Sequence, residues 1–216
     1  MRVKLGCLCH WSNWQKRYMM KRILLFCGLL ASLIPATVFA NPARAEDSSA
    51  LKNAVILIIR HAEPDHGHGL SSAGKARARA YANYFKNFTI DGQPLRLDYL
   101  FAARDSSISH RPLLTIEPTA KELGLTVNNH FYDKQFLELA HEIQSRPLGT
   151  NYLICWHHGN IPRLLRALGA DTKKLLPHGK WPGKVFSWLI QLRYDETGHL
   201  FESKRINANL LPGDSS

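Results

Sequence analysis

Residues 54–59 form an unbroken apolar run in which four of the six side chains are β-branched, and the run stops at Arg60-His61. A strand with one solvated face alternates apolar and polar residues, whereas this run has no alternation. The run therefore predicts a strand that is covered on both faces, as in a parallel sheet flanked by helices. Residues 97–102 and 152–156 are short, largely apolar segments that predict further strands of the same sheet.

Segments with helical periodicity separate these strands. After Ser71-Ser72, whose hydroxyls suit an N-cap, apolar residues recur every three or four positions as far as Phe88, with basic residues on the opposite face. Pro118 lies inside the next periodic segment and predicts a kink or two short helices. A turn at 195–198 favours a terminal hairpin. The expected helices are 71–88, 111–124, 136–143 and 161–168, and the expected hairpin strands are 185–194 and 200–205.

Strands that alternate with helices predict an α/β domain with three layers, α/β/α, and a mostly parallel central sheet. The chain has 216 residues, a length that suits one such domain with its own core. We expect this single domain to span residues 53–210.

The amino end has a different composition. Met20-Lys21-Arg22 precedes an apolar stretch, 23–33, and then the small-residue tripeptide Val38-Phe39-Ala40. A basic start, a short apolar middle and small residues before a cleavage point are typical of a secretory signal. We therefore expect residues 1–40 to be a signal peptide, 41–52 to be a flexible lead-in, and the mature protein to be secreted or periplasmic, with no stable membrane span. Met19 or Met20 is an alternative start, and a membrane anchor or buried helix is the alternative interpretation of the apolar stretch, which is short for a span.

The charge of the chain depends strongly on that leader. Residues 1–40 hold six of the 28 Lys and Arg and no acid, so the remainder has 22 basic and 17 acidic residues and a net charge of +5. These basic residues are scattered rather than grouped with aromatics, which disfavours nucleic acid and favours anionic small substrates. Cys155 is the only cysteine beyond residue 40, so the mature chain cannot form an intrachain disulfide.

Polar residues follow three of the expected strands. Arg60-His61 follows the first, the loop 104–111 the second, and His157-His158 the third. The carboxyl ends of parallel strands meet at one edge of a sheet, where ligands bind, so these groups are expected to converge. Two guanidiniums and two imidazoles would repel one another without a bound anion. Phosphate suits the site because its oxygens can accept two parallel N–H hydrogen bonds from one guanidinium. The sequence thus predicts a phosphate site.

Three motifs carry a family resemblance. They are Ile59-Arg60-His61-Ala62-Glu63, Leu70-Ser71-x-x-Gly74-x-x-Arg77, and Trp156-His157-His158-Gly159-Asn160. In this order and spacing they resemble the histidine phosphatase superfamily, the phosphoglycerate-mutase-like group. The resemblance implies the fold of that group, a phosphorylated small molecule or phosphoprotein as substrate, and no cofactor or metal.

The resemblance also implies roles for individual residues. His61 would attack phosphorus and become a phosphohistidine that water hydrolyses, and a neutral imidazole is a competent nucleophile for such a step. Arg60, Arg111 and His158 would bind the phosphate oxygens, with His158 as the second histidine of the site and His157 as its neighbour. Arg111 is preferred to Arg104 because Pro112 suits the first turn of a helix.

The general acid is the weakest match to the family. Gln135 stands nearest to the position of the usual acid, and Asp133 is the best substitute. An alkoxide leaves poorly without a proton, so a site without an acid would favour phosphoramidates or anhydrides as substrates. A helix N-cap is the alternative role for Asp133.

Two other functions remain open at this point. A metal-dependent hydrolase could draw ligands from six residues, although two arginines oppose a bound dication. A non-catalytic member of the fold would bind phosphate esters without turnover. The six candidate ligands are His61, Asp65, His66, His68, His157 and His158. Loop histidines such as His66 and His68 are more often solvated than functional, and Trp181, Phe186 and Trp188 are expected in the core or in a pocket wall.

Overall fold

The structure is a computed structural model that describes residues 51–214. The predicted signal peptide, 1–40, and most of the predicted lead-in, 41–52, lie outside these residues. Among residues 51–214, none of the helices combines the length and the apolar character that a membrane span requires.

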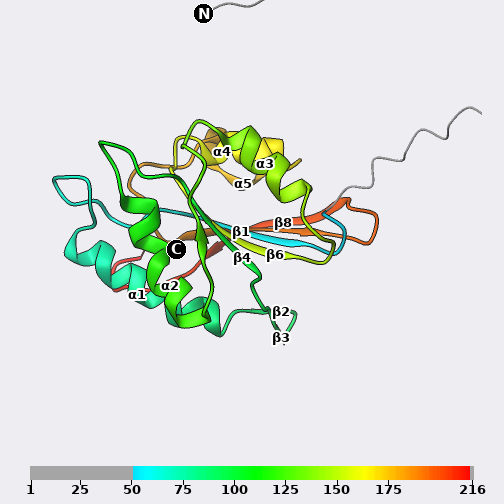
Figure 1. Ribbon diagram of the computed structural model, residues 1–216, viewed down its shortest axis with the longest axis horizontal. Helices are drawn as coiled ribbons and strands as arrows, with labels where there is room; N and C mark the ends of the chain where they lie inside the picture. The colour runs from blue at the N-terminus through cyan, green and yellow to red at the C-terminus, as the bar shows by residue number, and fades with distance from the viewer. Residues whose placement is uncertain (1–50, 215–216) are drawn as a thin grey trace, which may run out of the picture. The chain divides into compact units, whose positions relative to one another are not determined.

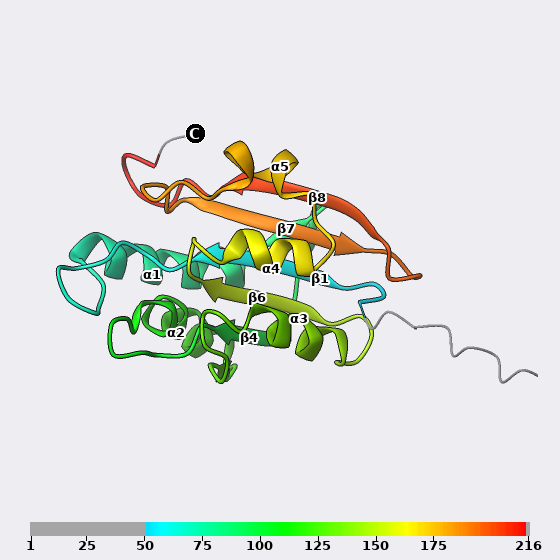
Figure 2. The ribbon, with the colours of Figure 1, turned by 90° about the horizontal axis from the view of Figure 1, so that it is seen from above.

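A six-stranded sheet forms the centre of the domain (Figures 1 and 2), in the order β5-β4-β6-β1-β7-β8. β1 runs parallel to β6, and β4 runs parallel to both β6 and β5. β7 runs antiparallel to β1 and to β8, so the sheet is mixed but mostly parallel, as predicted. The strands are β1 Val55–Arg60, β4 Tyr99–Ala102, β5 Val127–Asn128, β6 Asn151–Trp156, β7 Trp188–Tyr194 and β8 Leu200–Asn207. Two further strands, β2 Thr89–Ile90 and β3 Gln93–Pro94, form a separate small hairpin.

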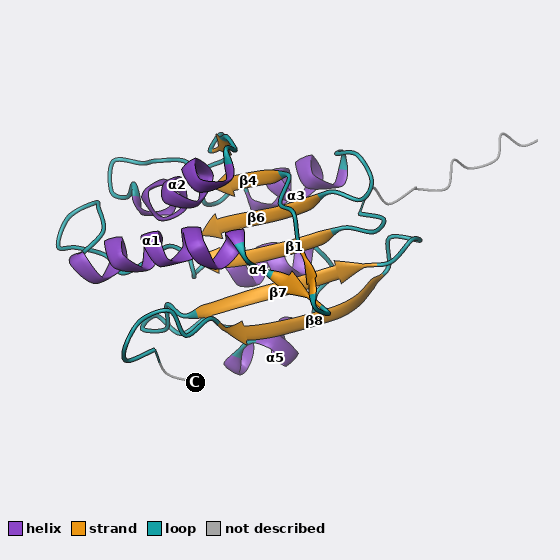
Figure 3. Cartoon of the chain, turned by 90° about the horizontal axis from the view of Figure 1, so that it is seen from below, coloured by secondary structure: helices purple, strands orange, loops and turns teal. Residues whose placement is uncertain are grey.

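Helices cover both faces of the sheet, which confirms the three-layer prediction (Figure 3). α1 (Ser72–Lys86) and α2 (Arg111–Leu123) lie on one face. α3 (Phe136–Gln144), α4 (Ile161–Ala167) and α5 (Thr172–Leu175) lie on the other face, followed by a 3₁₀ turn, Pro177–Gly179.

The side chains of β1 explain why the apolar run does not alternate. Ile56 and Ile58 pack in the core under α3 and α4, whereas Leu57 and Ile59 pack in the core under α1 and α2. All four are fully buried. Because burial of each such side chain is worth about 1.5–3 kcal/mol, both cores hold β1 and the residues that follow it in place.

Two details of the predicted elements differ in the structure. The segment around Pro118 does not divide into two short helices: α2 continues through Pro118, where the buried Ile116, Thr119 and Ala120 keep the helix packed. The strand predicted from residue 185 begins only at Trp188. The carbonyl of Val185 accepts a hydrogen bond from the side chain of Arg60 instead of from a neighbouring strand.

Candidate active site

His61 follows the last residue of β1. Its N–H donates to the carbonyl of Trp156 (3.0 Å), which continues the parallel pairing of β1 with β6, and the residue is only 3% exposed. Nδ1 lies 2.8 Å from the carbonyl oxygen of Ala62. Because a carbonyl only accepts, Nδ1 carries the proton in this contact and Nε2 keeps its lone pair. Burial lowers the pKa of His61 to about 3, and the charges of Arg60 and Arg111 lower it too, so the imidazole is neutral at pH 7.

His157 and His158, which follow β6, make different contacts. The ring of His157 meets the ring of His61 edge-on, with 5.1 Å between centroids. His158 instead lies near Gly183 and makes a hydrogen bond with the backbone of Trp181. Burial lowers the pKa of both rings. The second histidine implied by the resemblance, His158, stays a prediction, and His157 is the imidazole that the fold brings beside His61.

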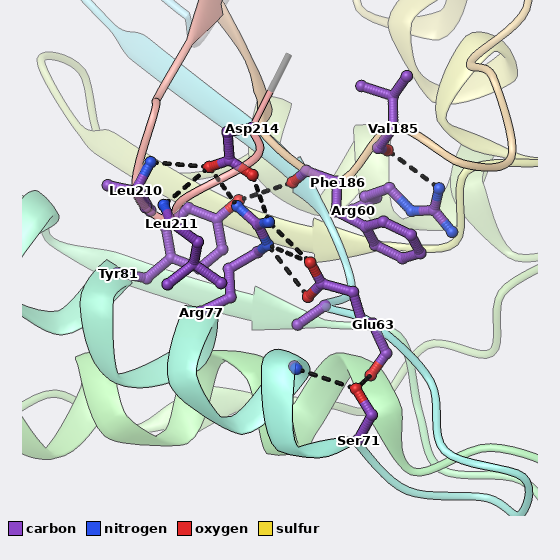
Figure 4. Close-up of polar contacts among 12 residues, drawn as sticks. Arg60, Glu63, Ser71, Arg77, Tyr81, Val185, Phe186, Leu210, Leu211 and Asp214 are labelled. Carbon is purple, nitrogen blue, oxygen red and sulfur yellow. Dashed lines mark hydrogen bonds and ion pairs between the residues drawn. The ribbon is translucent and has the colours of Figure 1, made fainter.

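Arg60 is buried at the end of β1 and held by a loop from the other end of the chain. Its Nη1 donates to the carbonyls of Gly183 (2.9 Å) and Val185 (3.0 Å), and its guanidinium lies 3.8 Å from the ring centroid of Phe186 (Figure 4). Burial lowers the pKa of Arg60 to about 10, so the side chain stays cationic at pH 7. Its Nε is buried and has no hydrogen-bond partner among residues 51–214.

Arg111 begins α2, and its charge reaches the same site. It is among the positive charges that lower the pKa values of His61 and His157. Its Nη2 donates to the carbonyl of Ile108 (3.1 Å), while its buried Nε has no partner within the described chain. Arg104 takes a different place, with its guanidinium 4.8 Å from the ring centroid of Tyr132.

Asp133 does not cap a helix, so the alternative prediction for this residue was wrong. Gln135 is the N-cap residue of α3, and Oδ2 of Asp133 instead accepts a 2.6 Å hydrogen bond from Nδ2 of Asn160. The carboxylate raises the pKa of His157 and of His158 against the larger lowering by burial. Oδ1 of Asp133 is buried without a protein partner in the region that the structure describes.

The second motif positions the loop after His61 (Figure 4). The hydroxyl of Ser71 donates to the carbonyl of Glu63 (3.3 Å) and accepts from the N–H of Gly74 (3.1 Å). A Cβ on Gly74 would overlap the carbonyl oxygen of Glu63, so glycine is required there. Arg77, 3% exposed, donates from Nε and Nη2 to the carboxylate of Glu63.

Asp214 completes this cluster from the far end of the described chain. It accepts from Nη1 (2.9 Å) and Nη2 (2.6 Å) of Arg77, and from the backbone N–H groups of Leu210 and Leu211. Arg77 therefore lies between two carboxylates, both at least partly buried. Glu63 is fully engaged as a structural partner of Arg77.

Comparison with known proteins bears on the fold. No protein-family model and no curated protein matches the chain. Among solved structures, the phosphoglycerate mutase of Plasmodium falciparum matches with a TM-score of 0.52 and 16% identity, over 76% of this chain and 96% of that chain. The fold is phosphoglycerate-mutase-like. Two other matches are the SixA protein of Agrobacterium tumefaciens (18% identity, TM-score 0.48, 69% of this chain and 96% of that one) and the phosphoglycerate mutase of Bacillus anthracis (14%, 0.46, 73% and 94%).

The phosphoglycerate-mutase-like fold brings most of the predicted site residues together. Arg60, His61 and His157 meet at the adjacent ends of β1 and β6. Arg111 acts electrostatically on both imidazoles, and Asp133 acts on His157. The likeness to the Plasmodium falciparum phosphoglycerate mutase shows the fold that the sequence resemblance implied.

The loop histidines of this phosphoglycerate-mutase-like chain do not join the cluster. His66 and His68 are exposed, and the side chain of Asp65 is occupied by the N–H groups of Gly67 and Gly69. Within residues 51–214, no three His, Cys, Asp or Glu side chains gather as a metal site would require.

Sequence reasoning missed two contributors. Asn160 is 8% exposed and joins Asp133 to Arg163, whose Nη1 donates to Oδ1 of Asn160 (3.0 Å). Its position directly after the His-Gly pair was the only signal. Asp214 had no signal, because nothing in its local sequence shows a partner 137 residues away.

Proposed function

We propose that the chain is a phosphatase, a phosphoric monoester hydrolase, that works through a phosphohistidine on His61. The observation that carries the proposal is the state of His61: a buried, neutral imidazole whose Nδ1 is held by a carbonyl and whose Nε2 has a lone pair, beside two guanidiniums. An imidazole in this state can attack phosphorus without first losing a proton.

The reaction divides into two displacements. In the first, Nε2 of His61 forms a bond to phosphorus while the bond from phosphorus to the ester oxygen breaks, and the leaving oxygen takes that electron pair and a proton. In the second, water attacks the phosphohistidine and gives a proton to the group that protonated the leaving oxygen. The N–P bond breaks, and its electron pair returns to Nε2 as inorganic phosphate leaves. Two steps replace one difficult displacement.

Arg60 and Arg111 would stabilise the phosphoryl group during both steps. Each has a buried Nε–H without a protein partner in the described part of the chain, and such a donor is suited to a phosphate oxygen. Arg60 is fixed by Gly183 and Val185 before any substrate binds, so little reorganisation accompanies the reaction.

Asp133 is the proposed source of the proton for the leaving oxygen. Asn160 binds Oδ2 and fixes the orientation of the carboxyl group, whereas the partnerless Oδ1 is the atom able to carry the proton. The substrate is a phosphorylated small molecule or phosphoprotein, and export to a secreted or periplasmic location rests on the signal-like pattern of residues 1–40.

The test replaces the nucleophile. His61→Ala is expected to abolish hydrolysis of an aryl phosphate such as 4-nitrophenyl phosphate and to abolish incorporation of acid-labile phosphate into the protein. The matched control is His66→Ala, an exposed histidine five residues further on, which should keep both properties. Unchanged turnover in His61→Ala would remove the mechanism, and tight phosphate-ester binding without turnover in the unmutated chain would favour a non-catalytic binding protein.

A further inference from the structure

Two consecutive hydrogen bonds lead from the proposed general acid, Asp133, to the surface of α4. Nδ2 of Asn160 donates to Oδ2 of Asp133 (2.6 Å), and Oδ1 of Asn160 accepts from Nη1 of Arg163 (3.0 Å). Asn160 is buried, whereas Arg163 is exposed. The mechanism proposed above uses Asp133 and Asn160 and gives no role to Arg163.

The backbone fixes the positions of all three side chains. The N–H of Asn160 donates to the carbonyl of His157 (3.0 Å), and the carbonyl of Asp133 accepts from Nε1 of the buried Trp156 (3.1 Å). Arg163 binds Asn160 a second time, because its backbone N–H donates to the carbonyl of Asn160 (3.0 Å). What remains to be set is the orientation of the Asn160 side-chain amide.

The two orientations of that amide have different consequences for Asp133. A side-chain amide has an NH₂ group that only donates and an oxygen that only accepts. If the NH₂ group faces Asp133, Oδ2 must accept, and the proton of a neutral carboxyl group is on Oδ1. If the amide oxygen faces Asp133, the same proton is held on Oδ2. The orientation of Asn160 therefore decides which carboxyl oxygen carries the proton.

Arg163 selects the first of these orientations. A guanidinium has donors and no acceptor, so it binds the amide oxygen of Asn160 and not the NH₂ group. Rotation of the amide would break this hydrogen bond and turn donors towards a cation. Oδ1 of Asp133 is buried and has no protein partner among residues 51–214, so a proton on this oxygen stays available to a substrate.

We propose that Arg163 is a positioning residue for the general acid, which orients Asn160 so that the proton of Asp133 stays on Oδ1. The inference rests on the proposed phosphatase function and adds to it a residue that acts through another. In the first displacement the O–H bond at Oδ1 breaks and the ester oxygen takes the proton. The carboxylate that remains keeps its hydrogen bond from Asn160, and water returns the proton in the second displacement.

The first test compares two substrates that differ in their need for this proton. Phenyl phosphate releases a strongly basic phenolate, whereas 4-nitrophenyl phosphate releases a weakly basic one that leaves without help. Arg163→Leu should lower kcat/KM by about tenfold for phenyl phosphate and by less than about twofold for 4-nitrophenyl phosphate, since only the first reaction depends on general acid catalysis. Arg163→Lys, which keeps a donor, should recover part of the loss.

The matched control is Arg166→Leu, which changes another exposed arginine of α4 and should leave the ratio of the two kcat/KM values unchanged. An equal loss for both substrates in Arg163→Leu, or no loss for either, would overturn the inference. In the Asp133→Asn chain, Arg163→Leu should cause no further loss for phenyl phosphate, because the two residues act as one unit. A further loss of the full size would show that Arg163 does not act through Asp133.

The side-chain amide of Asn160 provides a test that needs no turnover. Its protons are identified in nitrogen-15 NMR spectra by their absence in Asn160→Ala, and their exchange with solvent is measured. Exchange should become about fivefold faster in Arg163→Leu, because the amide is then free to rotate away from Asp133. Unchanged exchange would overturn the inference even in an active chain. Faster exchange in a chain that hydrolyses neither aryl phosphate would refute the phosphatase proposal and leave the orientation of Asn160 by Arg163 intact.

Discussion

The buried, neutral state of His61 predicts how the free energy of unfolding depends on pH. The pKa of His61 is about 3 in the folded chain, compared with 6.5 for an unperturbed histidine. Between these values the unfolded chain binds a proton that the folded chain does not, so the free energy of unfolding falls as pH falls through this window. The stabilising contribution is fully present above about pH 6.5 and is lost progressively towards pH 3.

The magnitude follows from the same two pKa values. Integrating the proton linkage for one group from pH 7 to pH 5 gives a loss of about 2 kcal/mol, because the unfolded imidazole becomes almost fully protonated while the folded one stays neutral. The range above pH 5 avoids most of the titration of carboxylates. His157 and His158 add losses of the same sign, since burial lowers their pKa values too.

The assay compares urea unfolding curves at pH 7, 6 and 5, followed by tryptophan fluorescence, for the unmutated chain and for His61→Gln. The variant should lose about 2 kcal/mol less than the unmutated chain between pH 7 and pH 5. His66→Gln, which changes an exposed side chain, should behave like the unmutated chain. Parallel curves for His61→Gln and the unmutated chain would refute the buried neutral state on which the proposed nucleophile depends.

Two further substitutions test the geometry of the site. Gly74→Ala should lower the free energy of unfolding by about 2 kcal/mol in urea titrations, because the new Cβ overlaps the carbonyl of Glu63. Gly67→Ala, where a Cβ makes only ordinary contacts, should leave the free energy of unfolding nearly unchanged, and equal stabilities of the two variants would contradict the packing argument. Arg111→Ala should lower kcat/KM for an aryl phosphate by about a hundredfold, whereas Arg104→Ala, which removes a side chain stacked on Tyr132, should lower it far less; the reverse order would transfer the phosphate role to Arg104.

The fold was predictable where the pattern of apolar residues along the chain indicates which side chains are buried. The unbroken run 54–59 predicted a doubly covered strand because its side chains enter two separate cores, which no alternating pattern could do. The same reasoning failed for the start of the next apolar segment, where Val185 and Phe186 contact Arg60 from the other end of the domain instead of joining the strand. Periodicity could not reveal that use of a backbone carbonyl.

The site was predictable as a group of residues but not in its fine arrangement. The parallel order of β1 and β6 predicted that Arg60-His61 and His157-His158 lie close together. Which imidazole faces His61 depends on the register of β1 against β6, where Arg60 lies opposite Trp156 and the next residues are His61 and His157. A shift of one residue would exchange His157 for His158, and no local pattern fixes that shift.

The cluster around Arg77 also affects the charge balance of the candidate site. One guanidinium lies between the carboxylates of Glu63 and Asp214, so the trio carries a surplus negative charge. Glu63 is the largest favourable charge acting on buried Arg60, and it raises the pKa of that guanidinium against the effect of burial. Glu63 is thus an internal counterion for the buried guanidinium of Arg60, whose charge the protein itself offsets in part without an anion from solvent.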